Sequence, residues 1–140
     1  MTFTLSHDVP HTTSTEIIRN VVFDRAKGVF QGKILVAKDA QKTDAKMSCN
    51  TLLLSDEGDF SAKPELEIFA DDVQCGHGAT VIDIDHTQLF YLLSRGIPEN
   101  KARAMLVNAF VAEIVEELEA DEALVEALEG VISAWLAKHA

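Results

Sequence analysis

The spacing of hydrophobic residues changes once along this chain, near Asp85, and this change constrains the fold more than any other feature. Before Asp85 the apolar residues form short runs, rich in β-branched and aromatic side chains and separated by clusters of Gly, Asp, Ser and Lys. Such runs are typical of β-strands. They cover residues 21–23, 29–30, 34–36, 52–54, 66–69 and 73–81.

After Asp85 the apolar spacing is that of α-helices. Asp85 is expected to cap a short helix that runs through Arg95 and ends at Gly96. Pro98 suits the first turn of a second helix, which continues to about Leu118. A third helix, capped by Asp121, is predicted from an apolar stripe formed by Leu124, Leu128, Val131, Ile132, Trp135 and Leu136. Strands followed by helices predict a mainly β plus α fold, without alternating βαβ units.

The strand region does not have the pattern of a simple meander. It contains no hairpin turn of the Asn-Gly type, and the connections between the apolar runs vary in length. A coiled stack of strands fits the pattern better, although such stacks need several turns and capped ends. The chain is therefore expected to begin inside such a stack. An open strand edge favours association, so a homodimer is expected for the isolated chain.

Composition indicates one globular domain of 140 residues, with 47% hydrophobic and 25% charged residues. No apolar run approaches the length of a membrane-spanning helix, and the first residues lack the basic and apolar regions of a secretory signal. The protein is therefore expected in the cytoplasm, where Cys49 and Cys75 would be free thiols.

Acidic residues outnumber basic residues, giving a net charge of -11 that disfavours binding to nucleic acid. The imbalance is strongest in residues 113–129, which contain eight acids and no lysine or arginine. Such a run is either a solvated helix face or a docking surface for a basic partner.

Cys75 and His77 are the main candidates for metal chemistry. Residues two apart on a strand point to the same side, so the thiol and the imidazole would share one face. Both groups bind transition metals, but a closed metal site usually has four ligands. A buried structural cysteine beside a partly exposed histidine is therefore the alternative. Asp71 and Asp72 either orient the imidazole or cap the turn before the strand.

The remaining motifs offer no catalytic set. There is no nucleophile elbow, zincin motif or phosphate-binding Gly-x-x-x-x-Gly-Lys loop, so the chain itself is not expected to hydrolyse ATP. His7 and His11 are expected in a turn or on the surface. A second hypothesis is a small metal-binding or enzyme-like domain in which Cys75 and His77 hold a metal within one chain.

Several linked segments of this chain resemble the SufB/SufD family. The order and spacing of these segments match the family over nearly the whole chain, and their final Cys-x-His-Gly-Ala-Thr form resembles its SufD branch. The segments are Pro-His-Thr-Thr-Ser (10–14), Gly-Val-Phe-Gln-Gly-Lys-Ile (28–34), Ala-Gln-Lys-Thr-Asp-Ala (40–45), Leu-Leu-Leu-Ser (52–55), residues 63–73, Cys-Gly-His-Gly-Ala-Thr (75–80), Leu-Phe-Tyr-Leu (89–92) and Ser-Arg-Gly (94–96).

The resemblance implies a non-catalytic scaffold for iron-sulfur cluster assembly. Its fold would be the C-terminal turns of a right-handed parallel β-helix, residues 1–85, followed by a small C-terminal domain of about three helices, residues 86–140. His77, with Cys75 as its neighbour, would help to hold a transient iron-sulfur cluster shared with a SufB-like partner. The helices would bind a SufC-like ATPase, through the candidate residues Tyr91, Arg95, Glu113, Glu116 and Glu117.

Two further expectations come from the resemblance. Family members are much longer, so this chain matches only their C-terminal part and is expected to be a fragment. Cys49 lies in a Cys-x-x-Leu-Leu context similar to that of a cluster-carrying cysteine of SufB. The alternative for Cys49 is a small core residue on a strand.

Overall fold

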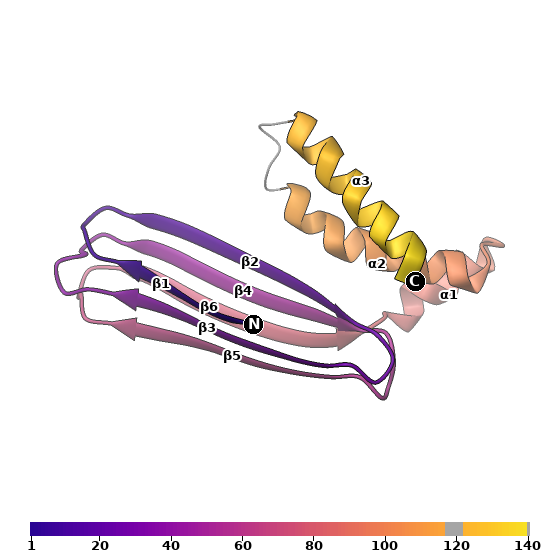
Figure 1. The fold of residues 1–140 in the computed structure, drawn as a ribbon, viewed down its shortest axis with the longest axis horizontal. Helices are drawn as coiled ribbons and strands as arrows, with labels where there is room; N and C mark the ends of the chain where they lie inside the picture. The colour runs from indigo at the N-terminus through magenta and orange to yellow at the C-terminus, as the bar shows by residue number, and fades with distance from the viewer. Residues whose placement is uncertain (117–121, 140) are drawn as a thin grey trace.

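The computed structural model describes residues 1–116 and 122–139, which form strands first and helices second (Figure 1). The predicted order of mainly β followed by α is therefore confirmed. The strands are β1 (Thr2–His7), β2 (Thr13–Val22), β3 (Lys27–Val36), β4 (Asp44–Leu53), β5 (Asp59–Ile68) and β6 (Gln74–Asp83). The helices are α1 (His86–Ser94), α2 (Glu99–Glu116) and α3 (Glu122–His139).

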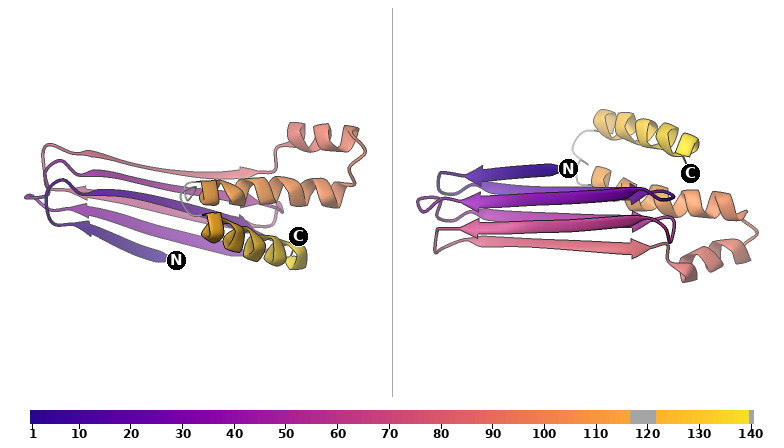
Figure 2. Two further views of the ribbon diagram at one scale, coloured as in Figure 1. Left: turned by 90° about the horizontal axis from the view of Figure 1, so that it is seen from above. Right: turned by 60° about the horizontal axis from the view of Figure 1, so that its bottom comes forward.

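The six strands form two parallel sheets of three strands each, ordered β1-β3-β5 and β2-β4-β6. Each strand pairs with the strand two places later, so the chain passes from one sheet to the other at every turn. The helices gather at the end of the sheets where β6 ends (Figure 1, Figure 2). Within the described chain, β5 and β6 are the last strands of their sheets and each has one open side.

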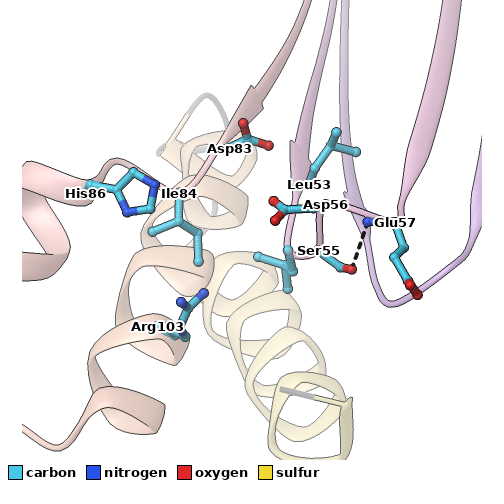
Figure 3. A pocket seen from close by; sticks show the side chains of 9 residues that line it. Leu53, Ser55, Asp56, Glu57, Asp83, Ile84, His86 and Arg103 are labelled. Carbon is cyan, nitrogen blue, oxygen red and sulfur yellow. Dashed lines mark hydrogen bonds between the residues drawn. The ribbon is translucent and has the colours of Figure 1, made fainter.

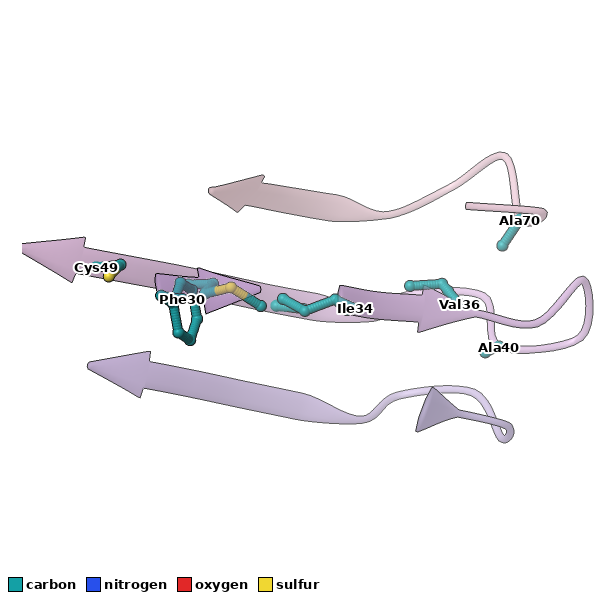
Figure 4. Close-up of a cluster of buried hydrophobic side chains, with 8 residues drawn as sticks. Phe30, Ile34, Val36, Ala40, Cys49 and Ala70 are labelled. Atoms are coloured by element: carbon teal, nitrogen blue, oxygen red, sulfur yellow. The ribbon is translucent and has the colours of Figure 1, made fainter. Parts of the chain in front are cut away.

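The main hydrophobic core lies between the sheets (Figure 4). Phe30, Ile34 and Val36 of β3 are almost fully buried, and Met47 and Cys49 of β4 belong to the same cluster. The interior is narrow at Gly32, where an added Cβ would lie 2.5 Å from the Phe30 ring and 2.8 Å from the Met47 sulfur. Alternate residues therefore fill the space between the sheets, while the intervening residues face outward.

A buried polar cluster joins the turn after β1 to the turn after β3. His7 is only 5% exposed, and its ring nitrogens lie 2.7 Å from Thr12 Oγ1 and 3.0 Å from Ser14 Oγ. Thr12 Oγ1 lies 3.1 Å from Thr43 Oγ1, whose hydroxyl donates to the carbonyl of Ala40 at 2.9 Å. Of the turn or surface role expected for His7, the surface alternative is wrong, because the interior of the turn supplies hydrogen-bond partners for the ring.

The helix signals before and after α1 are confirmed. The Asp85 carboxylate accepts hydrogen bonds from the backbone N–H groups of Thr87, at 2.7 Å, and Gln88, at 3.2 Å. Gly96 has a φ of 79°, a backbone conformation that favours glycine, and it follows the end of α1. No helix in the described part of the chain is long and apolar enough to cross a membrane.

The helices pack on β2 and on one another through a second core. This core contains Leu52, Ile84, Leu89, Ala102 and Val107. The ring of Phe23, just after β2, meets that of Trp135 of α3 edge to face, with centroids 5.5 Å apart. Three members of the stripe predicted for α3 are exposed instead: Leu124 at 43%, Val131 at 67% and Trp135 at 44%.

The strand boundaries were only partly predicted. The apolar runs did not predict β1, and they placed β2 at residues 21–23, whereas β2 begins at Thr13. The first half of β2 reads Thr-Ser-Thr-Glu, and even its inward positions, Ser14 and Glu16, are polar. The search for apolar runs therefore missed this half of the strand. The predicted end of the second helix at Leu118 and the cap at Asp121 lie outside the described residues.

Candidate functional site

The candidate site lies on β6, one of the two edge strands of the β2-β4-β6 sheet. The parallel register places Cys75 beside Ala45 and His77 beside Met47. Ala45 and Met47 are buried in the core between the sheets, so Cys75 and His77 occupy inward positions on one face, as the spacing predicted. Cys75 is half-buried and packs against the core, whereas His77 is exposed.

Among the residues that the structure describes, Cys75 and His77 are the two strong ligands of this site. Among the described residues, no group of three or more His, Cys, Asp and Glu side chains could hold a metal ion. Two ligands are half of a closed tetrahedral set. The site can therefore act as a closed metal centre only if ligands come from outside the described chain.

The environment of Cys75 favours the neutral thiol. Burial raises the pKa of Cys75, and the nearby Asp44 carboxylate raises it further, against a backbone hydrogen bond at Ala45 that lowers it. Because a metal binds the thiolate, binding at Cys75 must displace the thiol proton.

The acids before β6 belong to the turn. The carboxylate of Asp72 forms an ion pair with Lys42, and the Lys42 N–H donates to the Asp72 carbonyl at 2.6 Å. The Asp72 N–H donates to the Gln41 side-chain carbonyl at 2.9 Å. These contacts stack the turn before β6 on the turn before β4. They favour the turn-capping interpretation of Asp72.

Cys49 lies on β4 in the main core and is fully buried. Asn20 donates a hydrogen bond to its sulfur at 3.5 Å. Burial raises the pKa of the Cys49 thiol, although hydrogen bonds with Asn20 and Thr51 lower it. The register places Cys49 beside Ala79, further along the strand than His77. This environment favours the packing interpretation of Cys49.

Two of the candidate partner-binding residues lie together at the end of α1. Tyr91 is 55% exposed, and the Arg95 guanidinium lies 4.8 Å from the centroid of its ring. Phe90, beside it, is 71% exposed. The end of α1 therefore presents an aromatic surface with one cation.

The acidic candidates lie elsewhere. Glu113 on α2 forms an ion pair with Arg19 of β2, whose guanidinium also lies over the Phe110 ring at 5.0 Å. Glu113 therefore helps to fix α2 on the sheet. Glu116 is the last residue of α2, and its side chain is not described; Glu117 lies outside the described residues.

A hollow of about 440 Å³ lies between the strand ends and the helices (Figure 3). Leu53 and Ile84 provide apolar walls, and Asp56 and Asp83 direct carboxylates into it. Sequence reasoning missed this hollow because its lining comes from the loop after β4, the end of β6 and Arg103 of α2.

Comparison with known proteins matches residues 1–110 to the SufBD core domain of the SUF system for FeS cluster assembly. The iron-sulfur cluster assembly protein SufD of Escherichia coli K12 is 46% identical over 120 residues, covering 86% of this chain and 28% of that protein. A SufBD family protein of Synechocystis is 39% identical, covering 84% and 25%, respectively. Protein ABCI7, chloroplastic, of Arabidopsis thaliana is 37% identical, covering 79% and 23%.

The chain thus spans about a quarter of the length of these curated relatives. The matched region includes all six strands, α1 and most of α2, and therefore the Cys75–His77 pair. On this match, the chain belongs to the SufBD family of iron-sulfur cluster assembly proteins.

Proposed function

We propose that this chain is a non-catalytic scaffold subunit that supplies half of an assembly site for an iron-sulfur cluster. The observation that carries the proposal is the position of Cys75 and His77 on the inward face of a strand with an open side. A SufB-like partner would supply the remaining ligands. The cluster is cargo in this scheme, held only until it is transferred.

The proposed architecture is the end of a right-handed parallel β-helix, residues 1–85, followed by a helical domain, residues 86–140. The alternation of consecutive parallel strands between two sheets supports it. The relatives are about four times longer than the matched region, which leaves room for earlier turns beside β1 and β2. The open sides of β5 and β6 would then be the end available to a partner.

The hydrogen-bonding pattern of β6 supports pairing with a partner strand. The Gln74 N–H donates to the Thr43 carbonyl at 2.9 Å, toward β4. In a parallel strand, alternate residues direct their main-chain groups to opposite sides, so Cys75, His77 and Ala79 direct theirs to the open side. A strand added there would place its own side chains about 5 Å from Cys75 and His77 on the inward face.

The other open strand, β5, is less suited to strand addition. The Phe69 N–H donates to the Val36 carbonyl at 2.9 Å, so the odd-numbered residues of β5 bond to β3. The even-numbered Pro64 then faces the open side, where it has no N–H to donate. β5 also carries Lys63, Glu65 and Glu67, whereas β6 has no charged residue before Asp83. Charges and proline are common protections of strand edges, so the contrast favours β6 as the partner edge.

The ligand chemistry suits a transient cluster. Thiolate is the usual ligand of iron-sulfur clusters, and imidazole replaces it in some centres. Cys75 must lose its proton to bind iron, and the pKa of Cys75 is raised, so protonation would favour release. Two ligands from each chain would hold the cluster less permanently than a closed four-ligand set in one chain.

The helices are proposed to bind a SufC-like ATPase. The exposed Phe90 and Tyr91, with Arg95 beside them, are typical of the aromatic and arginine composition of protein interfaces. Tyr91→Ala should weaken binding of the ATPase, while reversal of exposed acids, such as Glu126→Lys, tests the acidic run separately. Unchanged affinity for Tyr91→Ala would contradict this part of the proposal.

The central experiment is cluster assembly with the chain, a SufB-like subunit and a SufC-like ATPase under anaerobic conditions. His77→Ala should greatly lower the cluster absorbance per complex, because it removes one of two local ligands. His86→Ala replaces another exposed histidine outside β6 and serves as the matched control. Circular dichroism checks that both variants remain folded. Normal assembly by a folded His77→Ala variant would refute the site assignment.

The alternative of a metal-binding or enzyme-like site within one chain has less support. It needs further ligands near Cys75 and His77, and the described residues provide no third. Stoichiometric, tightly held metal in the monomeric chain would favour this alternative over the shared site.

A further inference from the structure

The half-site on β6 becomes a complete tetrahedral set when it is doubled by a two-fold axis. Cys75 and His77 supply two ligands, and zinc sites of the structural type use four, commonly two cysteines and two histidines. A second copy of the same strand supplies the missing pair. A two-fold interface is self-complementary, so one strand can meet its own copy.

The edge of β6 allows two copies to approach. Residues 73–82 carry no acidic or basic side chain other than His77, so antiparallel pairing of these segments brings no fixed like charges together. The main-chain groups of Cys75, His77 and Ala79 face the open side, as the bond from Gln74 to Thr43 requires. These are the groups that an antiparallel neighbour would bond.

One register brings all four ligands together. If the two-fold axis passes beside Gly76, Cys75 of each copy lies opposite His77 of the other. Opposite Cα atoms in a hydrogen-bonded antiparallel pair are about 5.5 Å apart, and residues two apart along a strand are about 6.8 Å apart. The four side chains then project from the corners of a small rectangle, all on the inward face. Registers shifted by two residues place Cys75 opposite its own copy or opposite Ala79, and His77 is then no longer opposite Cys75.

Gly76 fits the position on the axis. Gly76 would face its own copy as a non-hydrogen-bonded pair, where Cα atoms approach to about 4.5 Å. Nothing in the chain lies within 4 Å of a Cβ added at Gly76, so packing within one copy does not require a glycine there. Close approach of a second backbone is a recognised reason for glycine in a strand.

We propose that two copies of this chain pair antiparallel along β6 and bind one zinc-class divalent ion through Cys75 and His77 of each copy. The inference extends the proposed function, since both use the same ligands and edge, to the state in which no SufB-like partner is bound. Each thiol loses a proton to solvent on binding, and each imidazole binds in its neutral form. Two thiolates balance the divalent charge, two protons are released per ion, and binding strengthens as pH rises.

Cobalt is a suitable probe because it adopts the tetrahedral geometry of zinc sites and is coloured. The metal-free, reduced chain is titrated with Co²⁺ while absorbance and sedimentation are recorded. We expect thiolate-to-cobalt absorption that saturates at one ion per two chains, together with a doubling of the sedimenting mass. Cys75→Ser and His77→Ala should abolish both signals, and Cys49→Ser should retain them. Binding at one ion per monomer, or the absence of binding, would overturn the proposal.

A matched pair of variants tests the strand pairing without changing a ligand. Ala79→Pro removes an N–H that faces the open side and so keeps the bonds to β4, as Pro64 does on β5. Ala79→Val keeps the N–H and is the control. With both variants folded by circular dichroism, Ala79→Pro should lose dimer and cobalt absorption, and Ala79→Val should keep them. Equal binding by the two variants would refute pairing along β6.

The outcomes separate this inference from the proposed function. In one outcome, the unchanged chain forms a cobalt-bound dimer and the His77→Ala variant still assembles normal amounts of cluster. This result would support the dimer site and refute the scaffold site. Loss of cluster assembly in His77→Ala, with no cobalt-bound dimer of the parent chain, would refute the dimer site alone.

Discussion

Thr43→Val tests the buried hydroxyl chain that joins the turns after β1 and β3. Thr43 is 1% exposed, and its hydroxyl is the donor to the Ala40 carbonyl at 2.9 Å. Valine preserves the shape of the side chain, so no cavity is created. The Thr12 hydroxyl loses Thr43 as a partner but retains the Val9 carbonyl at 3.3 Å. The Ala40 carbonyl is left without its donor.

The expected cost follows from this one unpaired group. A buried polar group that loses its hydrogen bond costs about 1–3 kcal/mol, so Thr43→Val should lower the free energy of unfolding by that amount. Urea unfolding followed by circular dichroism measures the change. Thr4→Val on β1 is the control, because Thr4 is exposed, and an exposed substitution usually changes stability by less than about 0.5 kcal/mol. Equal effects of the two substitutions would refute the reasoning.

The same chain of hydroxyls predicts the tautomer of His7. Thr43 uses its hydrogen on the Ala40 carbonyl, so Thr12 directs its own hydrogen toward Thr43 or Val9. Thr12 Oγ1 must then accept from His7 Nδ1, and Ser14 must donate to His7 Nε2. Nitrogen NMR of the neutral ring should therefore find the proton on Nδ1. A proton on Nε2 would reverse the two bonds of the His7 ring, to Thr12 and to Ser14, and would refute this assignment.

Three other predictions follow from the core, the helix contact and the thiols. Phe30→Ala should lower the unfolding free energy by about 3–5 kcal/mol in urea, because Phe30 is 1% exposed. Arg19→Met removes the Glu113 ion pair and should speed hydrogen exchange in α2 more than in β4; equal rates would contradict this. Burial raises the pKa of Cys49 and Cys75 above the ordinary 9.0. The contribution of the two neutral thiols to the free energy of unfolding is therefore fully present below pH 9.0 and is lost as the pH rises through the raised values. An unfolding free energy that does not change with pH in this alkaline range would contradict the prediction.

The sequence predicted the order of strands and helices because local signals determine it. Asp85 and Gly96 fix the two ends of α1 through hydrogen bonds and backbone conformation within a few residues. The first half of β2 could not be predicted in this way, because its polar residues are accommodated by a narrow interior and by partners from other strands, such as His7 of β1, whose ring bonds the Ser14 hydroxyl. Hydrophobic periodicity does not record such contacts.

The candidate ligands show a similar limit. Their shared face follows from the two-residue spacing, which the register confirms. Their place beside an open side depends on strand order, and β6 pairs with β4, about thirty residues earlier in the chain. Local sequence around Cys75 does not contain that information.

Pro64 is the sequence signal from which the open side could have been inferred. A proline inside a run of strand residues is tolerated at an edge, where its missing N–H faces away from the ladder. Pro64 on β5, with charged residues around it, therefore marks β5 as the last strand of its sheet. If strands alternate between two sheets, the next strand must be the last of the other sheet, and that strand carries Cys75 and His77. The proline and charges of β5 disfavour strand addition there, whereas the uncharged, glycine-containing edge of β6 allows it. Together the two edges direct association to the strand that holds the incomplete ligand set.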